Sequence, residues 1–135
     1  EWRDTTGRVR VGEQLPDRVL PITDSDRDIF LNRFEPALRG TVSQTPFAAI
    51  KPPFDDALTS ADGRVWLVKN RAIGDTLRSY QIVAGSGRLA VEATHPGLGR
   101  IIALGGGYAV VGEPFAGGVR LLLFRIPADT AVGGT

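Results

Sequence analysis

The sequence predicts a mainly antiparallel all-β protein with one short helix. Three observations lead to this class. A turn ending in Gly-Arg and followed by alternating aliphatic residues occurs three times, at Gly7-Arg8, Gly63-Arg64 and Gly87-Arg88. Glycine readily adopts the positive φ of a tight turn, and the alternation that follows fits a half-buried strand. Turn-forming separators then recur throughout the second half of the chain.

The composition narrows the classes of function. A chain of 135 residues supplies one domain with a modest core. Its net charge is +1, and the 16 basic and 15 acidic residues are spread along the chain, which argues against a nucleic-acid-binding surface. The sequence has no cysteine, so disulfides and thiolate nucleophiles are excluded. No apolar run approaches the roughly 18–20 residues of a membrane-spanning helix.

Residues 1–22 are predicted to form an outer strand and the connection by which the chain enters a blade-like sheet. Val9 and Val11 alternate with arginines, which gives one apolar and one charged face.

Residues 23–53 are predicted to form a helical and loop insertion. One helix is expected near residues 25–38, capped by Ser25 and carrying acidic residues in its first turn. Pro36 should end or kink this helix.

From residue 54 onward the pattern is that of successive hairpins. Residues 54–95 are predicted to form one full four-stranded sheet, residues 96–127 three strands of a last sheet, and residues 128–135 a polar tail. The expected strands are Asp56–Ser60, Arg64–Lys69, Leu77–Ala84, Arg88–Ala93, Arg100–Leu104, Tyr108–Glu113 and Val119–Ile126. The expected core aromatic residues are Phe54, Trp66, Tyr80, Phe115 and Phe124.

A longer repeat relates the two ends of the chain. Gly7 and Gly87 each precede a proline by nine residues, at Pro16 and Pro96, and a short strand with arginine and aliphatic residues follows each proline. Such a passage from an outer strand through a proline turn to a new strand is typical of the boundary between propeller blades.

The stretch from Pro52 to Val68 resembles blade sequences of six-bladed β-propellers of the NHL/TolB-like kind. In that family an inner strand is followed by an Asp-Gly turn, here Asp62-Gly63, and by a strand bearing tryptophan, here Trp66. Residues 79–83 and 87–93 resemble the third and outer strands of the same blade. The resemblance covers residues 52–127 well and the first 50 residues loosely.

The resemblance implies a partial propeller. A blade takes about 40–50 residues and closed propellers have about four to eight blades, so the chain is similar to the C-terminal two to three blades only. The expected partner is therefore a protein: the remaining blades or a larger complex. Exposed sheet edges of such a piece should favour association. A free-standing β-sandwich built from the same hairpins remains an alternative.

Two small polar clusters are candidate ligand-binding residues. Lys69, Asn70 and Arg71 end the strand that bears Trp66, and loops at strand ends carry many binding sites. Asp55 and Asp56 precede an inner strand, where family channels are lined, and their oxygens suit a cation such as Ca²⁺. For both clusters the structural interpretation, a solvated hairpin end and a strand-start cap, is favoured over ligand binding.

No catalytic constellation is found in the sequence. His95 is the only histidine and is expected to be exposed in an inter-blade turn. The alternating aspartates of residues 24–28 lack the glycine and glutamate of a Ca²⁺ loop, so helix capping explains them. No catalytic residue, metal site or cofactor is predicted.

The predicted function is therefore a non-catalytic protein-interaction or scaffold module. It would be part of an exported bacterial β-propeller, periplasmic or otherwise extracytoplasmic, or a subunit of a larger assembly without nucleic acid. The start at Glu1-Trp2 is expected of a processed or truncated N-terminus. The alternative is a fragment of a propeller enzyme of the lactonase or sugar dehydrogenase type, with an active site completed by missing blades.

Overall fold

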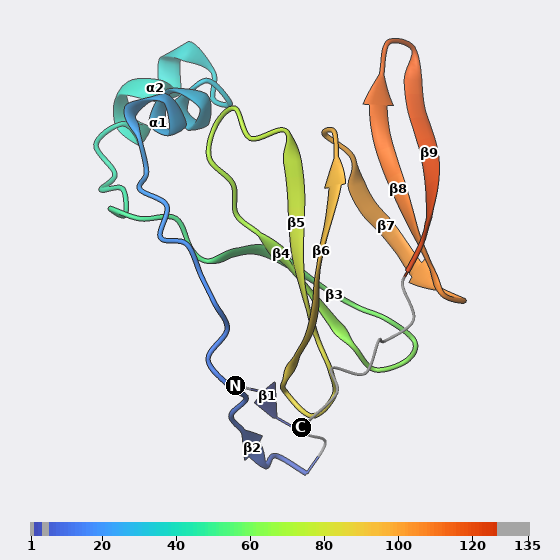
Figure 1. The fold of residues 1–135 in the computed structure, drawn as a ribbon. Coiled ribbons are helices and arrows are strands. Elements are labelled where there is room, and N and C mark those ends of the chain that lie inside the picture. The colour runs from blue at the N-terminus through green and yellow to red at the C-terminus, as the bar shows by residue number, and fades with distance from the viewer. Residues whose placement is uncertain (1, 4–5, 127–135) are drawn as a thin grey trace.

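The computed structural model describes residues 2–3 and 6–126 and is mainly antiparallel β, as predicted (Figure 1). Its elements in chain order are β1 (Trp2–Arg3), β2 (Val9–Arg10), α1 (Asp24–Leu31), α2 (Pro36–Val42), β3 (Phe54–Thr59), β4 (Val65–Lys69), β5 (Leu77–Val83), β6 (Leu89–Pro96), β7 (Arg100–Gly105), β8 (Tyr108–Phe115) and β9 (Gly118–Arg125). The predicted tail, residues 128–135, lies outside the described residues.

The strands form two larger sheets in which sequence neighbours are also spatial neighbours. The first sheet has the order β3-β4-β5-β6 and the second the order β7-β8-β9. All seven strands predicted from residue 54 onward are present, with ends that shift by at most three residues. The three glycines of the Gly-Arg turns have positive φ, 82° at Gly7, 79° at Gly63 and 86° at Gly87. The turn chemistry of the sequence therefore determines where these strands begin.

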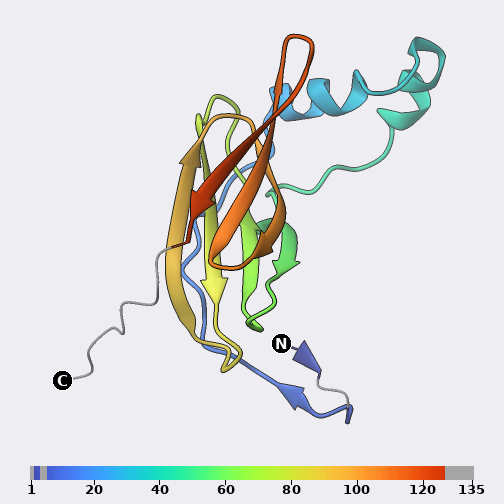
Figure 2. The ribbon, with the colours of Figure 1, turned by 90° about the vertical axis from the view of Figure 1, so that its right-hand side faces the viewer.

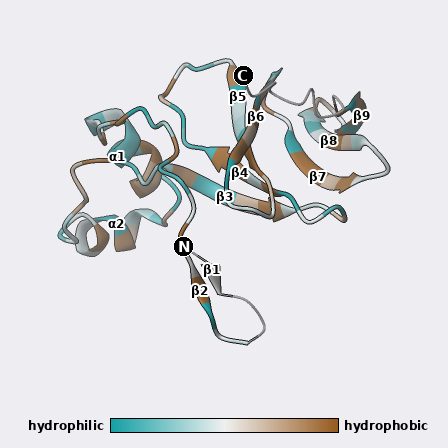
Figure 3. Ribbon diagram, turned by 60° about the horizontal axis from the view of Figure 1, so that its bottom comes forward, coloured by the Kyte–Doolittle hydropathy of each residue, from teal (hydrophilic) through white to brown (hydrophobic). Residues whose placement is uncertain are grey.

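The core lies between the two sheets, which pack face to face (Figures 1 and 2). Ribbon colours mark β7 as hydrophobic along most of its length (Figure 3). Fully burying a large aliphatic side chain stabilises a fold by about 1.5–3 kcal/mol. The buried core residues are Trp66, Val68, Tyr80 and Ile82 of the first sheet and Ile101, Ala109 and Val111 of the second.

The other face of the first sheet is covered by the N-terminal segment rather than by a sheet. The Gln81 side chain, 1% exposed, donates to the Pro16 carbonyl at 2.6 Å. The backbone N–H of Leu89 donates to Glu13 at 2.8 Å. The outer strand predicted within residues 1–22 differs from the structure, since β2 is two residues long and pairs only with β1. Hydrogen bonds between side chains and backbone groups hold this segment in place of a strand ladder.

The helical region contains two helices where the sequence predicted one. Thr23, not Ser25, caps α1, and Asp26 completes a capping box with it. Pro36 begins α2 instead of only ending α1, because its fixed φ and missing N–H suit the first turn of a helix. Both helices lie beyond one end of the first sheet, and the N-terminal hairpin lies beyond the other (Figures 1 and 2).

The predicted aromatic core is correct in part. Trp66 and Tyr80 are buried at 3% and 2% exposure. Phe115 was predicted to be core but is 56% exposed, because it ends β8 at the tip of the last hairpin. Phe124 is 36% exposed and packs through one face of its ring.

The passage from the first sheet to the second depends on a glycine. Gly99 is buried and lies against β8. A Cβ atom at this position would collide with Cγ1 of Val111 and lie 3.3 Å from the Gly112 carbonyl oxygen. The connection between β6 and β7 can therefore lie this close to β8 only because this position has no side chain.

We expect Gly99→Ala to lower the free energy of unfolding by about 1–3 kcal/mol, since the added methyl group must displace buried Val111. Urea denaturation measures this change. The control is Gly105→Ala in the same sheet, where an added Cβ meets no atom within 4 Å and φ is not positive. Equal losses in the two variants would contradict the close approach at Gly99.

Candidate functional site

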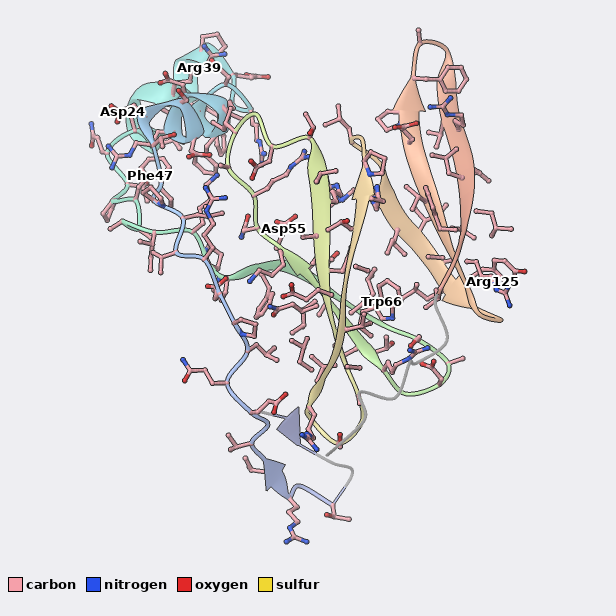
Figure 4. The ribbon with its side chains drawn as sticks, viewed as in Figure 1. Asp24, Arg39, Phe47, Asp55, Trp66 and Arg125 are labelled. Carbon is pink, nitrogen blue, oxygen red and sulfur yellow. The ribbon has the colours of Figure 1, made fainter. Side chains whose placement is uncertain are left out.

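The two predicted ligand clusters lie at the same end of the first sheet. Asp55 and Asp56 belong to β3, and Lys69 ends β4, where it pairs with Phe54. Asp55 lies toward the end of the sheet that is nearer the helices (Figure 4). The structure thus brings together residues that the sequence left separate, and ligand binding by them stays a prediction.

Lys69 is occupied by contacts within the chain. Its Nζ donates to Oδ1 of Asp17 at 2.6 Å and to the Pro16 carbonyl at 3.2 Å. The ammonium group also lies 5.3 Å from the ring centre of Phe54. The hydrogen bond from Lys69 lowers the pKa of the Asp17 carboxyl. Lys69 therefore anchors the N-terminal segment to the sheet.

Asn70 has a similar structural role. Its Nδ2 donates to the Pro52 carbonyl at 2.8 Å, and its backbone N–H donates to the Pro53 carbonyl at 3.2 Å. These bonds close the hairpin end around a proline pair, which has no backbone N–H to offer.

The two aspartates are exposed and are not gathered into a metal site. Asp56 accepts a hydrogen bond from the backbone N–H of Ala57 at 2.8 Å, and Asp55 lies 3.7 Å from Arg100 of β7. In the part of the chain that the structure describes, no three histidine, aspartate or glutamate side chains come together as a potential metal centre.

Arginines, rather than lysine and asparagine, accompany Asp55. Arg78 interacts electrostatically with Arg71, Arg100 and Asp55, and Arg100 lies 3.7 Å from Asp55. Burial, followed by the positive charge of Arg71, lowers the pKa of Arg78. Sequence reasoning missed Arg78 and Arg100. Arg78 could have been found from the alternation of side chains along β5, which places it on the same face as Tyr80 and Ile82.

His95 was predicted to be an exposed loop residue, and this was wrong. It lies on β6 and is 6% exposed. Its ring packs between Tyr80, 5.6 Å away, and Phe124, 5.9 Å away. The His-Pro dipeptide suggested a turn, but Pro96 only ends the strand, where a missing N–H is tolerated.

Both ring nitrogens of His95 are engaged. Nδ1 lies 2.9 Å from the Pro96 carbonyl, which can only accept, so Nδ1 carries the proton. Nε2 lies 2.9 Å from the Tyr80 hydroxyl, from which it accepts in the tautomer protonated at Nδ1. Burial raises the pKa of Tyr80, which keeps its hydroxyl protonated as the donor. Among the described residues, His95 has no serine or carboxylate partner of the kind that catalytic histidines use.

A cavity of about 290 Å³ lies between the sheets beside this stack. Its lining is mostly apolar and aromatic, and Glu92 and Thr94 supply polar groups. The indole of Trp66 lies between the two sheets (Figure 4), and its Nε1 is buried without a hydrogen-bond partner. The cavity therefore offers an apolar wall and an unpartnered indole N–H, and the histidine that lines it is already hydrogen-bonded through both ring nitrogens.

Comparison with known proteins does not assign a family. No protein-family model, no curated protein and no solved structure matches the chain. No helix in the described residues has the length and apolar character needed to cross a membrane.

The backbone of Arg71 is tied to the helices through Lys51. Nζ of Lys51 donates to the Arg71 carbonyl at 3.0 Å and to Oδ1 of Asp26 at 2.5 Å. Asp26 also accepts from the backbone N–H and hydroxyl of Thr23. The hydrogen bond from Lys51, together with those from Thr23, lowers the pKa of Asp26 to about 2.

This pKa predicts an acid-sensitive attachment of α1. A carboxyl whose pKa falls on folding stabilises the fold above its ordinary value of 3.8, and this stabilisation is lost as the pH falls toward about 2. We expect the melting temperature of the wild type to fall more steeply over this range than that of Asp26→Asn. Circular dichroism melts at a series of pH values measure the difference.

The matched control is Asp24→Asn, because the Asp24 side chain is 95% exposed and makes only a 3.4 Å contact with Arg27. Its pH dependence should follow that of the wild type. Parallel curves for wild type and Asp26→Asn would contradict the role of Asp26.

Proposed function

We propose that this chain is a non-catalytic interaction module that stacks with further β-sheets in a larger assembly. One observation carries this proposal. The face of β7-β8-β9 that points away from the first sheet exposes a set of large aliphatic side chains, which we call the outer face. Its most exposed members are Ile102 at 60%, Val119 at 64%, Leu121 at 63% and Leu123 at 65%.

The outer face is continuous across the three strands. Leu123 pairs with Val110, and Leu121 pairs with Gly112. A Cβ atom at Gly112 would lie 3.4 Å from Ile102 and 3.5 Å from Val119, so these two side chains flank the glycine. Contiguous apolar patches of this kind on a protein surface mark sites of interaction.

The occupant that fits this surface is another antiparallel β-sheet. The same three strands already pack their inner face, with Ile101 and Val111, against the first sheet. The outer face offers the same residue types at the alternate positions, and sheets pack on sheets through such interdigitating faces. In a solution of this chain alone, a second copy supplies that sheet.

The propeller resemblance agrees with this proposal and extends it. Successive four-stranded and three-stranded meanders stacked face to face are what neighbouring blades require. On this proposal the chain is part of an exported, extracytoplasmic β-propeller or a subunit of a larger complex. No observation favours the alternative of a propeller-enzyme fragment, because the hydrogen bonds of His95 are structural.

Light scattering coupled to size exclusion tests the proposal. We expect the wild type to self-associate as its concentration rises, and the double variant Leu121→Lys with Leu123→Lys to remain monomeric, since burying two ammonium groups opposes sheet stacking. Both positions are exposed, so circular dichroism should show an unchanged fold.

The control is Val11→Lys with Val19→Lys, which adds the same charge at two exposed valines of the N-terminal segment, 79% and 68% exposed. This variant should associate as the wild type does. A wild type that stays monomeric at every concentration, or a control that dissociates equally, would overturn the proposal.

A further inference from the structure

We propose that Arg71, Arg78 and Arg100 form a binding site for a small phosphate-like dianion at the rim between the two sheets. The site is built from three different parts of the chain: the loop after β4, the start of β5 and the start of β7. It is separate from the outer face of β7-β8-β9 and does not depend on the proposed interaction there.

Arg78 is the centre of the argument. It lies opposite His95 across the β5–β6 pair, on the face of β5 that enters the core. Its Nε is buried without a hydrogen-bond partner, and its guanidinium has no ion pair or hydrogen bond among the described residues. A half-buried cation that lacks a partner lowers stability, because it loses hydration without compensation.

The surrounding charges increase that cost. Arg71 and Arg100 both oppose the charge of Arg78, whereas Tyr80 and the Asp55 carboxylate favour it. Asp55 is shared with Arg100, whose guanidinium lies 3.7 Å away. Arg71 also donates to the Asp75 carbonyl at 3.5 Å. The three guanidinium groups and the Asp55 carboxylate together carry a net charge of +2.

The chemistry of the cluster selects the class of ligand. A guanidinium presents its donors as a planar fork that matches the oxygens of phosphate in pairs. A dianion balances the local charge of +2, whereas a monoanion leaves one positive charge uncompensated. Solvent reaches the cluster, since the side chains of Arg100 and Asp55 are 65% and 48% exposed.

Isothermal titration of the purified chain with inorganic phosphate tests this site. We expect binding to the wild type, and an affinity about tenfold lower in Arg78→Gln, since charge-assisted hydrogen bonds are lost. Asp55→Asn should have the opposite effect and tighten binding about threefold, because it removes the competing carboxylate. If Arg78 has only a structural role, the affinity for phosphate should not rise in Asp55→Asn.

The matched control is Arg88→Gln, which removes the same charge at a side chain that is 79% exposed and lies 4.0 Å from Glu13. Phosphate affinity there should stay within about twofold of the wild type. If Arg78→Gln does not fold, Arg71→Gln replaces it, with the same expected loss. A parallel titration with succinate tests whether the site prefers a dicarboxylate to phosphate.

Three results would overturn the proposal: no heat of binding with phosphate, equal losses in Arg78→Gln and Arg88→Gln, or succinate binding tighter than phosphate. The last result would assign the arginines to a carboxylate ligand instead.

Discussion

The stack of Tyr80, His95 and Phe124 determines how the two sheets are placed. Tyr80 and His95 belong to the first sheet, and Phe124 belongs to the last strand of the second. The hydrogen bond between Tyr80 and His95 orients both rings, and the backbone of Ile101 on β7 interacts with the Tyr80 hydroxyl. Arg78 lies two residues before Tyr80, and the start of β7 directly precedes Ile101. The contact that joins the sheets therefore also brings Arg78 near Arg100.

The two sheet faces that point away from the core differ in what covers them. On the first sheet, the N-terminal segment supplies polar partners: Nε2 of the buried Gln81 donates to the Pro16 carbonyl and also to Glu92 of β6, while its Oε1 has no partner. On the second sheet, no described segment covers Leu121 and Leu123. A polar covering tolerates contact with water, whereas an aliphatic face is stabilised only by further burial. This asymmetry gives the stack a direction in which another sheet can be added.

Much of the fold could be predicted from the sequence, because local chemistry determines it. Positive φ at Gly63 and Gly87 and strict alternation after them specify the hairpins. The helix cap was misplaced by two residues, since serine is by itself at least as good a cap as threonine and only the bonds between Thr23 and Asp26 decide for Thr23. The burial of His95 and the grouping of Arg78 with Arg100 could not be predicted, because both depend on how two sheets pack. Tertiary contacts of this kind leave no local signature.

Stability alone does not explain an arginine at position 78. The neighbouring positions on the same face of β5 hold Tyr80 and Ile82, both almost fully buried. An apolar side chain of similar length would continue that face without the cost of desolvating a guanidinium, and replacing buried charges in this way is often neutral or stabilising. Arg78 instead remains beside two like charges, and Asp55 offsets only part of them. Residues that break a local rule at a cost in stability are concentrated at functional sites. This reasoning supports the proposed anion site at the rim between the sheets rather than a ligand in the aromatic cavity.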